Sequence, residues 1–356
     1  MTVNAGPRVE RVTVEPLDLP LREPFEIALG TQHEAHNVLV RVETDDGVVG
    51  YGEGSPLPPV TGETHEAALA TARSAGDLVE GEPVADYRRL TDELRSTFPG
   101  NASALFAVET AVLDAHCRER ELALSELFGG PPRPVTTDLT IPILSPTDAA
   151  DRARDAVADG FEHLKVKTGS GVEGDVERVA AVREAAPDAE LKVDANQGWT
   201  PSQTVRFCRA IADRGIDLAL VEQPVVADDV QGLAHVRERV AVPVAADEAV
   251  FTPADAMRVV RAEAADVINV KLGKSGPVAA AEIAAIARAA NRELMVGCML
   301  ESAVGIHTSA HVVAGLGDFD YVDLDGNLLL ATDVIPTERT PTVDIDGPGH
   351  GVVPDR

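Results

Sequence analysis

The sequence predicts an α/β protein, a (β/α)8 TIM-type barrel that carries a second, α+β capping domain. Three observations support this fold class. The 356 residues exceed the roughly 200–250 residues that one barrel needs. Short β-branched runs alternate with Ala-rich helical stretches across residues 131–326. Polar residues gather where those runs end, which is where barrel enzymes keep their active sites.

Residues 1–130 predict the capping domain. Its strands and helices are expected, in order, at 9–19, 37–53, 64–78, 84–98 and 102–120. The second strand segment predicts a hairpin that turns at Asp46-Gly47. The run from Gly129 to Pro132 is typical of a domain boundary. Residues 327–356 lack the strand-helix repeat, and we expect them to return to the capping domain.

Eight apolar runs predict the strands of the catalytic barrel over residues 131–326. They lie at 135–143, 163–168, 190–195, 218–223, 243–247, 266–272, 293–299 and 320–325. Most of them are apolar throughout, as in parallel strands that are buried on both faces. A doubly wound open sheet is the alternative, but no GxGxxG motif follows a first strand.

The composition of the chain limits the classes of binding partner that we expect. A formal net charge of −28 argues against nucleic acid, because the surface would repel phosphates. It is also typical of acidic surfaces suited to high salt. Three cysteines without metal-site spacing, no apolar leader and no membrane-length apolar run predict a cytoplasmic protein that does not contact membranes. The expected partner is a small carboxylate substrate, and a homo-oligomer is compatible with the sequence.

Lysine is rare and clustered. Only five of the 31 basic residues are lysine, and they are Lys165, Lys167, Lys192, Lys271 and Lys274. Lysine, unlike arginine, can lose its proton when its pKa is lowered, so it can serve as a base. Lys165 and Lys167 are two residues apart, on one face of the second barrel strand. Lys271 ends the sixth strand.

Three acidic residues end the third, fourth and fifth barrel strands, namely Asp194, Glu222 and Asp247. The intervals from Asp194 through to Lys271 are 28, 25 and 24 residues, about one βα unit each. Carboxylates that converge on one barrel mouth repel each other unless a cation is bound. Oxygen ligands predict Mg²⁺, with Mn²⁺ as the alternative. Helix capping by each acidic residue is the rival interpretation.

The motifs LKVKTG, VDAN, VEQP, ADEA and NVKLGKSG occur here in the order in which they occur in a known family. Together with AVETAVLDA and ELFGG in the capping domain, they resemble the muconate-lactonizing subgroup of the enolase superfamily. The resemblance implies that Asp194, Glu222 and Asp247 bind Mg²⁺. It also implies that Lys167 and Lys271 are acid/base groups on opposite faces of the substrate, while Lys165 stabilises an enolate.

The end of the eighth strand selects among the reactions of that subgroup. Asp323 and Asp325 are two apart and would bind a cationic group, which resembles the dipeptide epimerases, where this pair holds the α-ammonium group. The implied reaction is epimerisation at the α-carbon of the C-terminal residue. The same resemblance places Thr140, Cys298 and Leu300 in the substrate pocket.

Three other functions stay open. A muconate-type cycloisomerase or an o-succinylbenzoate synthase-like enzyme would use the same lysines with one of them idle. A class I aldolase-type barrel would form a Schiff base on a lysine. A non-catalytic, acidic binding protein is the third.

One departure bears on the substrate: Gly30 stands where Ala-Glu epimerases carry an arginine for the glutamate side chain. Only His33 or Arg22 could replace that cation, so a small or apolar C-terminal residue is expected.

Overall fold

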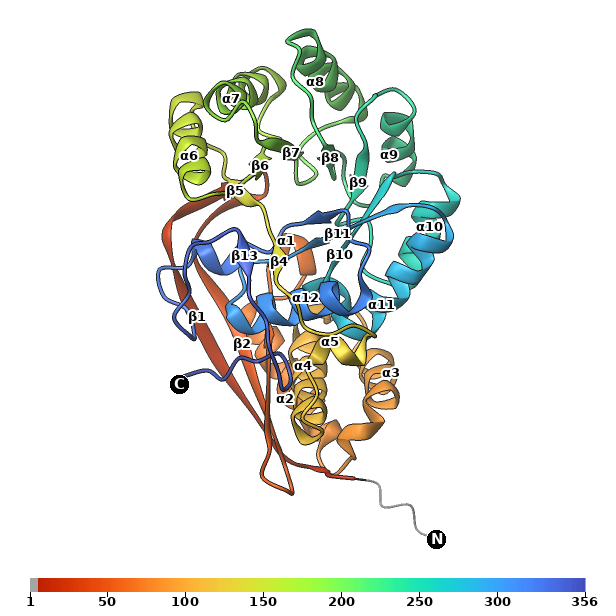
Figure 1. Ribbon diagram of the computed structural model, residues 1–356. Helices are drawn as coiled ribbons and strands as arrows, with labels where there is room; N and C mark the ends of the chain where they lie inside the picture. The colour runs from red at the N-terminus through yellow and green to blue at the C-terminus, as the bar shows by residue number, and fades with distance from the viewer. Residues whose placement is uncertain (1–5, 356) are drawn as a thin grey trace.

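The computed structural model describes residues 6–355, which fold into a barrel and an α+β cap, drawn below the barrel in Figure 1. The cap is built on an antiparallel sheet in the order β1 (Val9–Ile27), β2 (Gly30–Thr44) and β3 (Val49–Gly54). The predicted hairpin between the last two strands is confirmed. Its turn places Gly47 at φ +83°, a left-handed conformation that glycine adopts without strain.

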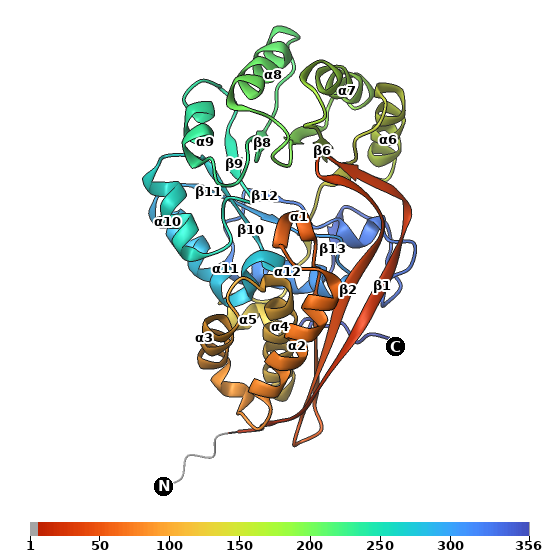
Figure 2. The same cartoon turned by 180° about the vertical axis from the view of Figure 1, so that it is seen from behind.

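The first two strands run much farther than their sequence pattern predicts. β1 continues through residues 20–27 and β2 begins at Gly30, so the pair forms a long arm. Pro20, Pro24 and several charged residues hide this arm, because they interrupt apolar alternation. The pairing register shifts between Pro20 and Phe25. Both views show the tip of the arm beside β6 of the barrel (Figures 1 and 2).

The cap helices cover one face of this sheet. They are α1 (Pro58–Thr61), α2 (His65–Val79), η1 (Val84–Asp86), α3 (Tyr87–Thr97), α4 (Ala102–Glu119) and α5 (Leu124–Leu127). The predicted helices at 64–78, 84–98 and 102–120 are thus confirmed, except that the second begins as a 3₁₀ turn. Glycines on β3 let α4 approach its backbone, since a Cβ at Gly52 would lie 2.0 Å from the carbonyl oxygen of Ala107.

The barrel is a parallel sheet of eight strands. They are β5 (Leu139–Ile141), β6 (His163–Lys167), β7 (Glu190–Asp194), β8 (Leu220–Glu222), β9 (Val244–Ala246), β10 (Val267–Lys271), β11 (Glu293–Gly297) and β12 (Tyr321–Val322). Each pairs with the next strand in sequence. The amide of Asp138 donates to the carbonyl of Val322 at 3.2 Å, which brings the first and last strands together.

Helices follow the first seven strands. They are α6 (Pro146–Ala158), α7 (Val172–Ala185), α8 (Pro201–Asp213), α9 (Val230–Arg237), α10 (Pro253–Arg261), α11 (Leu272–Ala289) and α12 (Ala303–Leu316). After β12 the described chain forms the 3₁₀ turn η2 (Gly326–Leu329) and one short strand outside the barrel. The helices close the barrel's outer layer with small side chains, mainly alanine and valine, packed at zero or near-zero exposure.

The first predicted barrel strand, 135–143, is divided in two. β4 (Val135–Thr136) leaves the barrel and pairs with β13 (Thr342–Val343), and only β5 belongs to the barrel. The break lies at Asp138, whose carboxylate is fully buried and forms an ion pair with Lys192. Further C-terminal contacts with the cap are the bridges Leu21–Leu330 and Ala123–Gly349.

Two buried glutamates fasten the cap to the barrel. Glu53 on β3 accepts hydrogen bonds from the amides of Ser302 and Gly305 at the start of α12, at 2.9–3.1 Å. Glu109 on α4 accepts from the amide of Val278 at 2.7 Å. Carboxylates are favoured at helix N-termini, where amides lack partners within the helix. These contacts hold the cap over the barrel mouth.

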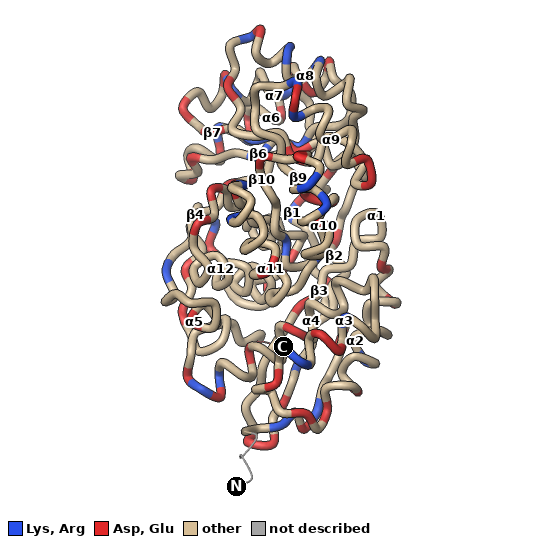
Figure 3. Tube along the Cα trace, turned by 90° about the vertical axis from the view of Figure 1, so that its right-hand side faces the viewer, with Lys and Arg blue, Asp and Glu red and all other residues tan. Residues whose placement is uncertain are grey.

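Asp and Glu recur along the trace of both the barrel and the cap (Figure 3), and the formal net charge of the chain is −28. In the described part of the chain, no helix combines the length and the apolar character that crossing a bilayer demands.

Candidate active site at the barrel mouth

A cavity lies at the carboxyl ends of the barrel strands, between the barrel and the cap. Of the residues predicted to act on or contact substrate, all eight line it: Thr140, Lys165, Lys167, Lys271, Cys298, Leu300, Asp323 and Asp325. The three predicted metal ligands lie deeper, at the same strand ends, with exposures of 0–1%. The structure therefore brings the whole predicted set together, from strands that are far apart in sequence.

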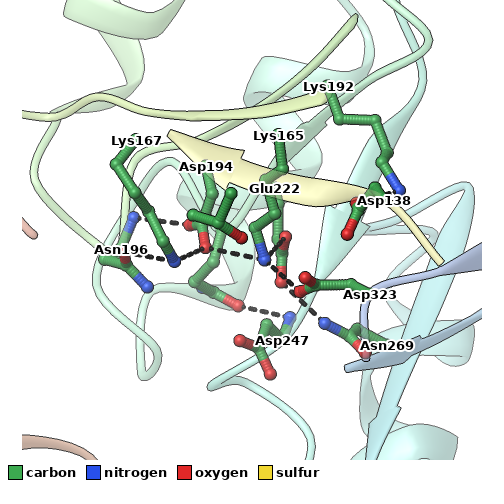
Figure 4. Close-up of polar contacts among 12 residues, drawn as sticks. Asp138, Lys165, Lys167, Lys192, Asp194, Asn196, Glu222, Asp247, Asn269 and Asp323 are labelled. Carbon is green, nitrogen blue, oxygen red and sulfur yellow. Dashed lines mark hydrogen bonds and ion pairs between the residues drawn. The ribbon is translucent and has the colours of Figure 1, made fainter. Parts of the chain in front are cut away.

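Lysine ammonium groups bridge the acidic residues at the floor of the cavity (Figure 4). Lys165 Nζ lies 3.3 Å from Asp194 Oδ2 and 2.9 Å from Glu222 Oε2. Lys167 Nζ donates to Asp194 Oδ2 at 2.7 Å. Both lysines come from β6, whose alternate residues point to one side, so the two amines reach the same carboxylate.

Asp247 is shared between two further lysines. Lys271 Nζ donates to its Oδ2 at 2.9 Å, and Lys274 Nζ donates to its Oδ1 at 2.6 Å. Burial acts to raise the pKa of Asp247, but these two ammonium groups outweigh it and hold that pKa below its ordinary value. Burial acts to lower the pKa of Lys271, but the Asp247 charge outweighs it and raises that pKa. The pair is thus ionised.

Of the three predicted metal ligands, Glu222 has the negative charge that neighbouring groups compensate least. Burial, reinforced by the charge of Asp194, raises its pKa to about 7. Asn269 Nδ2 donates to its Oε1 at 2.6 Å. Its Oε2 accepts no hydrogen bond from any described residue, although Lys165 Nζ lies nearby. A buried carboxylate oxygen without a hydrogen bond is costly unless a cation satisfies it.

These residues fit a divalent cation. The donors are carboxylate oxygens, which hard ions such as Mg²⁺ prefer. A positive group, the Lys165 ammonium, already lies within 3.3 Å of oxygens from both Asp194 and Glu222. Each carboxylate is also oriented from outside: the amide of Asn196 donates to Asp194 Oδ1 at 2.8 Å, leaving Oδ2 toward the cavity. Partners of this kind orient the ligands of a metal site.

A second group of carboxylates lies on the other side of Lys165. Asp138, Asp323 and Asp325 each place an oxygen within 4.8 Å of the others. Lys165 Nζ donates to Asp323 Oδ2 at 2.5 Å, and the amide of Thr140 donates to Asp325 Oδ2 at 2.6 Å. Burial and the Asp323 charge raise the pKa of Asp325 to about 6. Excess negative charge here attracts a cation, which an ammonium group or a metal could supply.

Several polar residues of the site escaped sequence reasoning. Asn196 and Glu248 line the cavity, and Asn269, Lys274 and Asp138 support it from beneath. A signal existed for one of them. Asn269 stands two residues before the predicted site residue Lys271 on the same strand, and alternate residues of a strand share a face.

The roof of the cavity comes from the cap and is mostly apolar. Phe25, Ile27, Leu57 and Val60 line it together with Gln32. Among the described residues of this roof, none is charged. Gly30 lies at the turn of the arm, where an added Cβ would meet no described atom within 4 Å.

Comparison with known protein families gives two matches that together cover most of the chain. Residues 9–129 match the mandelate racemase / muconate lactonizing enzyme N-terminal domain. Residues 148–356 match the enolase C-terminal domain-like family.

Individual relatives match over nearly their whole length. The chain is 35% identical to an L-Ala-D/L-Glu epimerase of Bacillus subtilis, over 97% of both chains. It is 38% identical to a hydrophobic dipeptide epimerase of Enterococcus faecalis, over 91% of this chain and 92% of that one. A crystal structure of a dipeptide epimerase from Enterococcus faecalis, complexed with Mg and L-Leu-L-Tyr, superimposes with a TM-score of 0.93 at 36% identity, over 97% and 99% of the two chains.

Proposed function

The chain belongs to the mandelate racemase / muconate lactonizing enzyme family of the enolase superfamily, and from this membership we propose that it is a Mg²⁺-dependent dipeptide epimerase. Its relatives are epimerases and racemases, and the chain is an isomerase. The observation that carries the finer proposal is the floor of the cavity. There, two lysines from opposite sides of the barrel, Lys167 on β6 and Lys271 on β10, line one space beside three buried carboxylates.

Asp194, Glu222 and Asp247 would hold the metal ion. When bound, Mg²⁺ supplies positive charge beside the substrate carboxylate, which lowers the cost of removing the neighbouring α-proton. Lys165 adds a fixed ammonium at the same place, because its acidic neighbours outweigh burial and raise its pKa well above the ordinary value. A positive charge that is already in place stabilises developing enolate charge without reorganisation.

Lys167 and Lys271 would exchange protons with the α-carbon. One lysine takes the α-proton as a neutral amine, and the other returns a proton from the opposite face as an ammonium, which inverts the configuration. In the reverse reaction the two exchange roles. Each lysine hydrogen-bonds a proposed metal ligand here, Lys167 to Asp194 and Lys271 to Asp247. A cation on those carboxylates would compete for the same oxygens and free the amines for substrate.

Asp323 and Asp325 would bind the α-ammonium group of the substrate. Their position opposite the first carboxylate group separates the two ends of a dipeptide, with the carboxylate toward the metal and the amine toward this pair. Thr140 orients Asp325 through its amide. Cys298 and Leu300, from the loop after β11, would contact the substrate between these ends.

We propose that the C-terminal residue of the substrate is apolar. The roof offers Phe25, Ile27, Leu57 and Val60 to that side chain, and the position that would carry a glutamate-binding arginine is Gly30. A glutamate side chain buried against this roof would lose water without gaining an ion pair. The Enterococcus faecalis structure with L-Leu-L-Tyr supports an apolar dipeptide in a site of this kind.

The test is deuterium incorporation. In D₂O with Mg²⁺, L-Ala-L-Leu should gain one deuterium at the leucine α-carbon and yield L-Ala-D-Leu, followed by mass spectrometry and chiral analysis. EDTA should abolish the exchange and Mg²⁺ should restore it. L-Ala-L-Glu serves as the matched acidic substrate and should react much more slowly.

Other results would select the rival functions. Turnover of a muconate without exchange into any dipeptide would establish a cycloisomerase instead. Trapping of a lysine adduct by borohydride with EDTA present would establish Schiff-base chemistry.

A further inference from the structure

Asp18, His36 and His65 form a cluster on the cap that the proposed reaction does not use. Asp18 on β1 is paired directly across the arm with His36 on β2, and His65 is the first residue of α2. Each of the three offers one ligand atom that lies within 4.8 Å of the others. His36 Nδ1 lies 2.7 Å from Asp18 Oδ1. The two imidazole rings stack with their centroids 5.7 Å apart.

The second nitrogen of each histidine already faces an oxygen. His65 Nε2 lies 3.0 Å from the carbonyl oxygen of Asn37, so this nitrogen carries the proton and Nδ1 keeps its lone pair. His36 Nε2 lies 3.9 Å from Glu34 Oε2. Histidines that bind metals usually present the other ring N–H to a carbonyl or carboxylate, which fixes the tautomer and the ring orientation. His65 has this arrangement, whereas the separation at His36 is too long for a hydrogen bond.

We propose that Asp18, His36 and His65 bind a divalent transition metal of the Zn²⁺ class. The ligands are one Asp18 carboxylate oxygen and one nitrogen of each imidazole, with the fourth position open to water, and the ion would displace the proton between His36 Nδ1 and Asp18 Oδ1. Two imidazoles and a carboxylate suit Zn²⁺, whereas the oxygen donors of the barrel suit Mg²⁺. The side chains of Asp18 and His36 are 52% and 55% exposed, so an ion can enter from solvent.

The position of this site gives it a structural consequence. It joins β1, β2 and α2, and the same arm carries Phe25 and Ile27 to the roof of the active site. An ion held there would fasten the arm to the cap helices. The site is independent of the proposed epimerase activity, since it contains none of the residues of the barrel mouth.

The experiment uses Co²⁺ as the probe, with the whole protein and with Mg²⁺ in excess to occupy the barrel site. A four-coordinate site with nitrogen ligands gives Co²⁺ intense visible absorption, whereas a six-coordinate site of oxygens gives very weak absorption. We expect one equivalent of Co²⁺ to produce the intense band, and Zn²⁺ to displace it.

His36→Gln and His65→Gln should each weaken binding by more than about 100-fold, because even the outer partners of metal ligands contribute about 10- to 100-fold. His33→Gln is the matched control, since His33 is exposed on the same strand three residues earlier. Asp18→Asn is a further variant. It removes the carboxylate ligand in the arm and leaves both imidazoles in place. An intense band that survives in the His36 and His65 variants, or no intense band in the native protein, would overturn the proposal.

Discussion

The floor and the roof of the active-site cavity are built on opposite physical principles. The floor, from β6 to β12, is made of buried charged groups whose positions are fixed by hydrogen bonds and ion pairs of 2.5–3.3 Å. The roof, from the arm and the segment at α1, is mostly apolar, and its described lining residues carry no charge. A floor fixed in this way suits one reaction, whereas van der Waals contacts in the roof can change with little cost to the fold. We therefore expect the barrel to perform the proposed chemistry and the cap to select the substrate.

The largest expected effect comes from removing a floor lysine. Lys271→Ala and Lys167→Ala should each lower kcat by about 10²- to 10⁴-fold, the usual contribution of a general acid or base. The sharper readout is deuterium exchange starting from each epimer separately. One variant should lose exchange from the L,L-dipeptide and the other from the L,D-dipeptide, because each lysine serves one face. Equal residual exchange from both epimers in both variants would contradict the two-face arrangement.

Metal binding should depend on one carboxylate group and not on the other. Glu222→Gln is expected to weaken Mg²⁺ binding by at least about tenfold, measured by calorimetry without substrate, because it removes the charge of a buried oxygen donor. Asp325→Asn is the matched control and should leave Mg²⁺ affinity unchanged. The reverse pattern would place the metal at Asp138, Asp323 and Asp325.

The same control variant has its own effect on substrate. Asp325→Asn should raise KM for L-Ala-L-Leu by roughly 10-fold or more, since a hydrogen bond to a charged group is worth about 1.5–3 kcal/mol. N-acetyl-L-Ala-L-Leu, which lacks the ammonium, should bind both proteins equally weakly. A KM that rises equally for both substrates would show that the variant disturbs the floor in general.

Glu301 tests the seam between floor and roof, because Ser55 Oγ of the cap donates to its Oε1 at 3.3 Å. Burial raises the pKa of Glu301 to about 8. The folded state therefore binds more protons than the unfolded state between about pH 4.5 and 8, and stability falls as pH rises through this window. Glu301→Gln should lose less stability from pH 5 to pH 9 in urea unfolding. Glu184→Gln, exposed on α7, is the control, and an unchanged pH slope for Glu301→Gln would refute the assignment.

The smallest effect is expected in the roof. Ile27→Val removes one methylene, worth about 0.8 kcal/mol, so KM for L-Ala-L-Leu should rise roughly fourfold. The value of kcat should stay unchanged, because the roof does not touch the reacting atoms. A fall in kcat without a change in KM would contradict the proposal that the floor performs the chemistry and the roof selects the substrate.

The sequence by itself predicted which charged groups converge at the barrel mouth. Lys165, Lys167, Asp194, Glu222, Asp247 and Lys271 fall at regular intervals at the ends of apolar strands. Parallel strands bring such ends to one rim, so spacing alone predicts convergence. The hairpin at Asp46-Gly47 and the helices of the cap followed equally from local pattern and turn chemistry.

Only the tertiary structure decided how the cavity is covered and supported. The arm over residues 20–36, the division of the first barrel strand at Asp138, and the contacts of Glu53 with α12 all depend on partners far away in sequence. So does the cluster of Asp18, His36 and His65, which meets only because β1, β2 and α2 pack together. Helices and strands bury residues at a regular spacing, which a sequence displays as a periodic pattern. The packing of one domain against another leaves no such periodic pattern in the sequence.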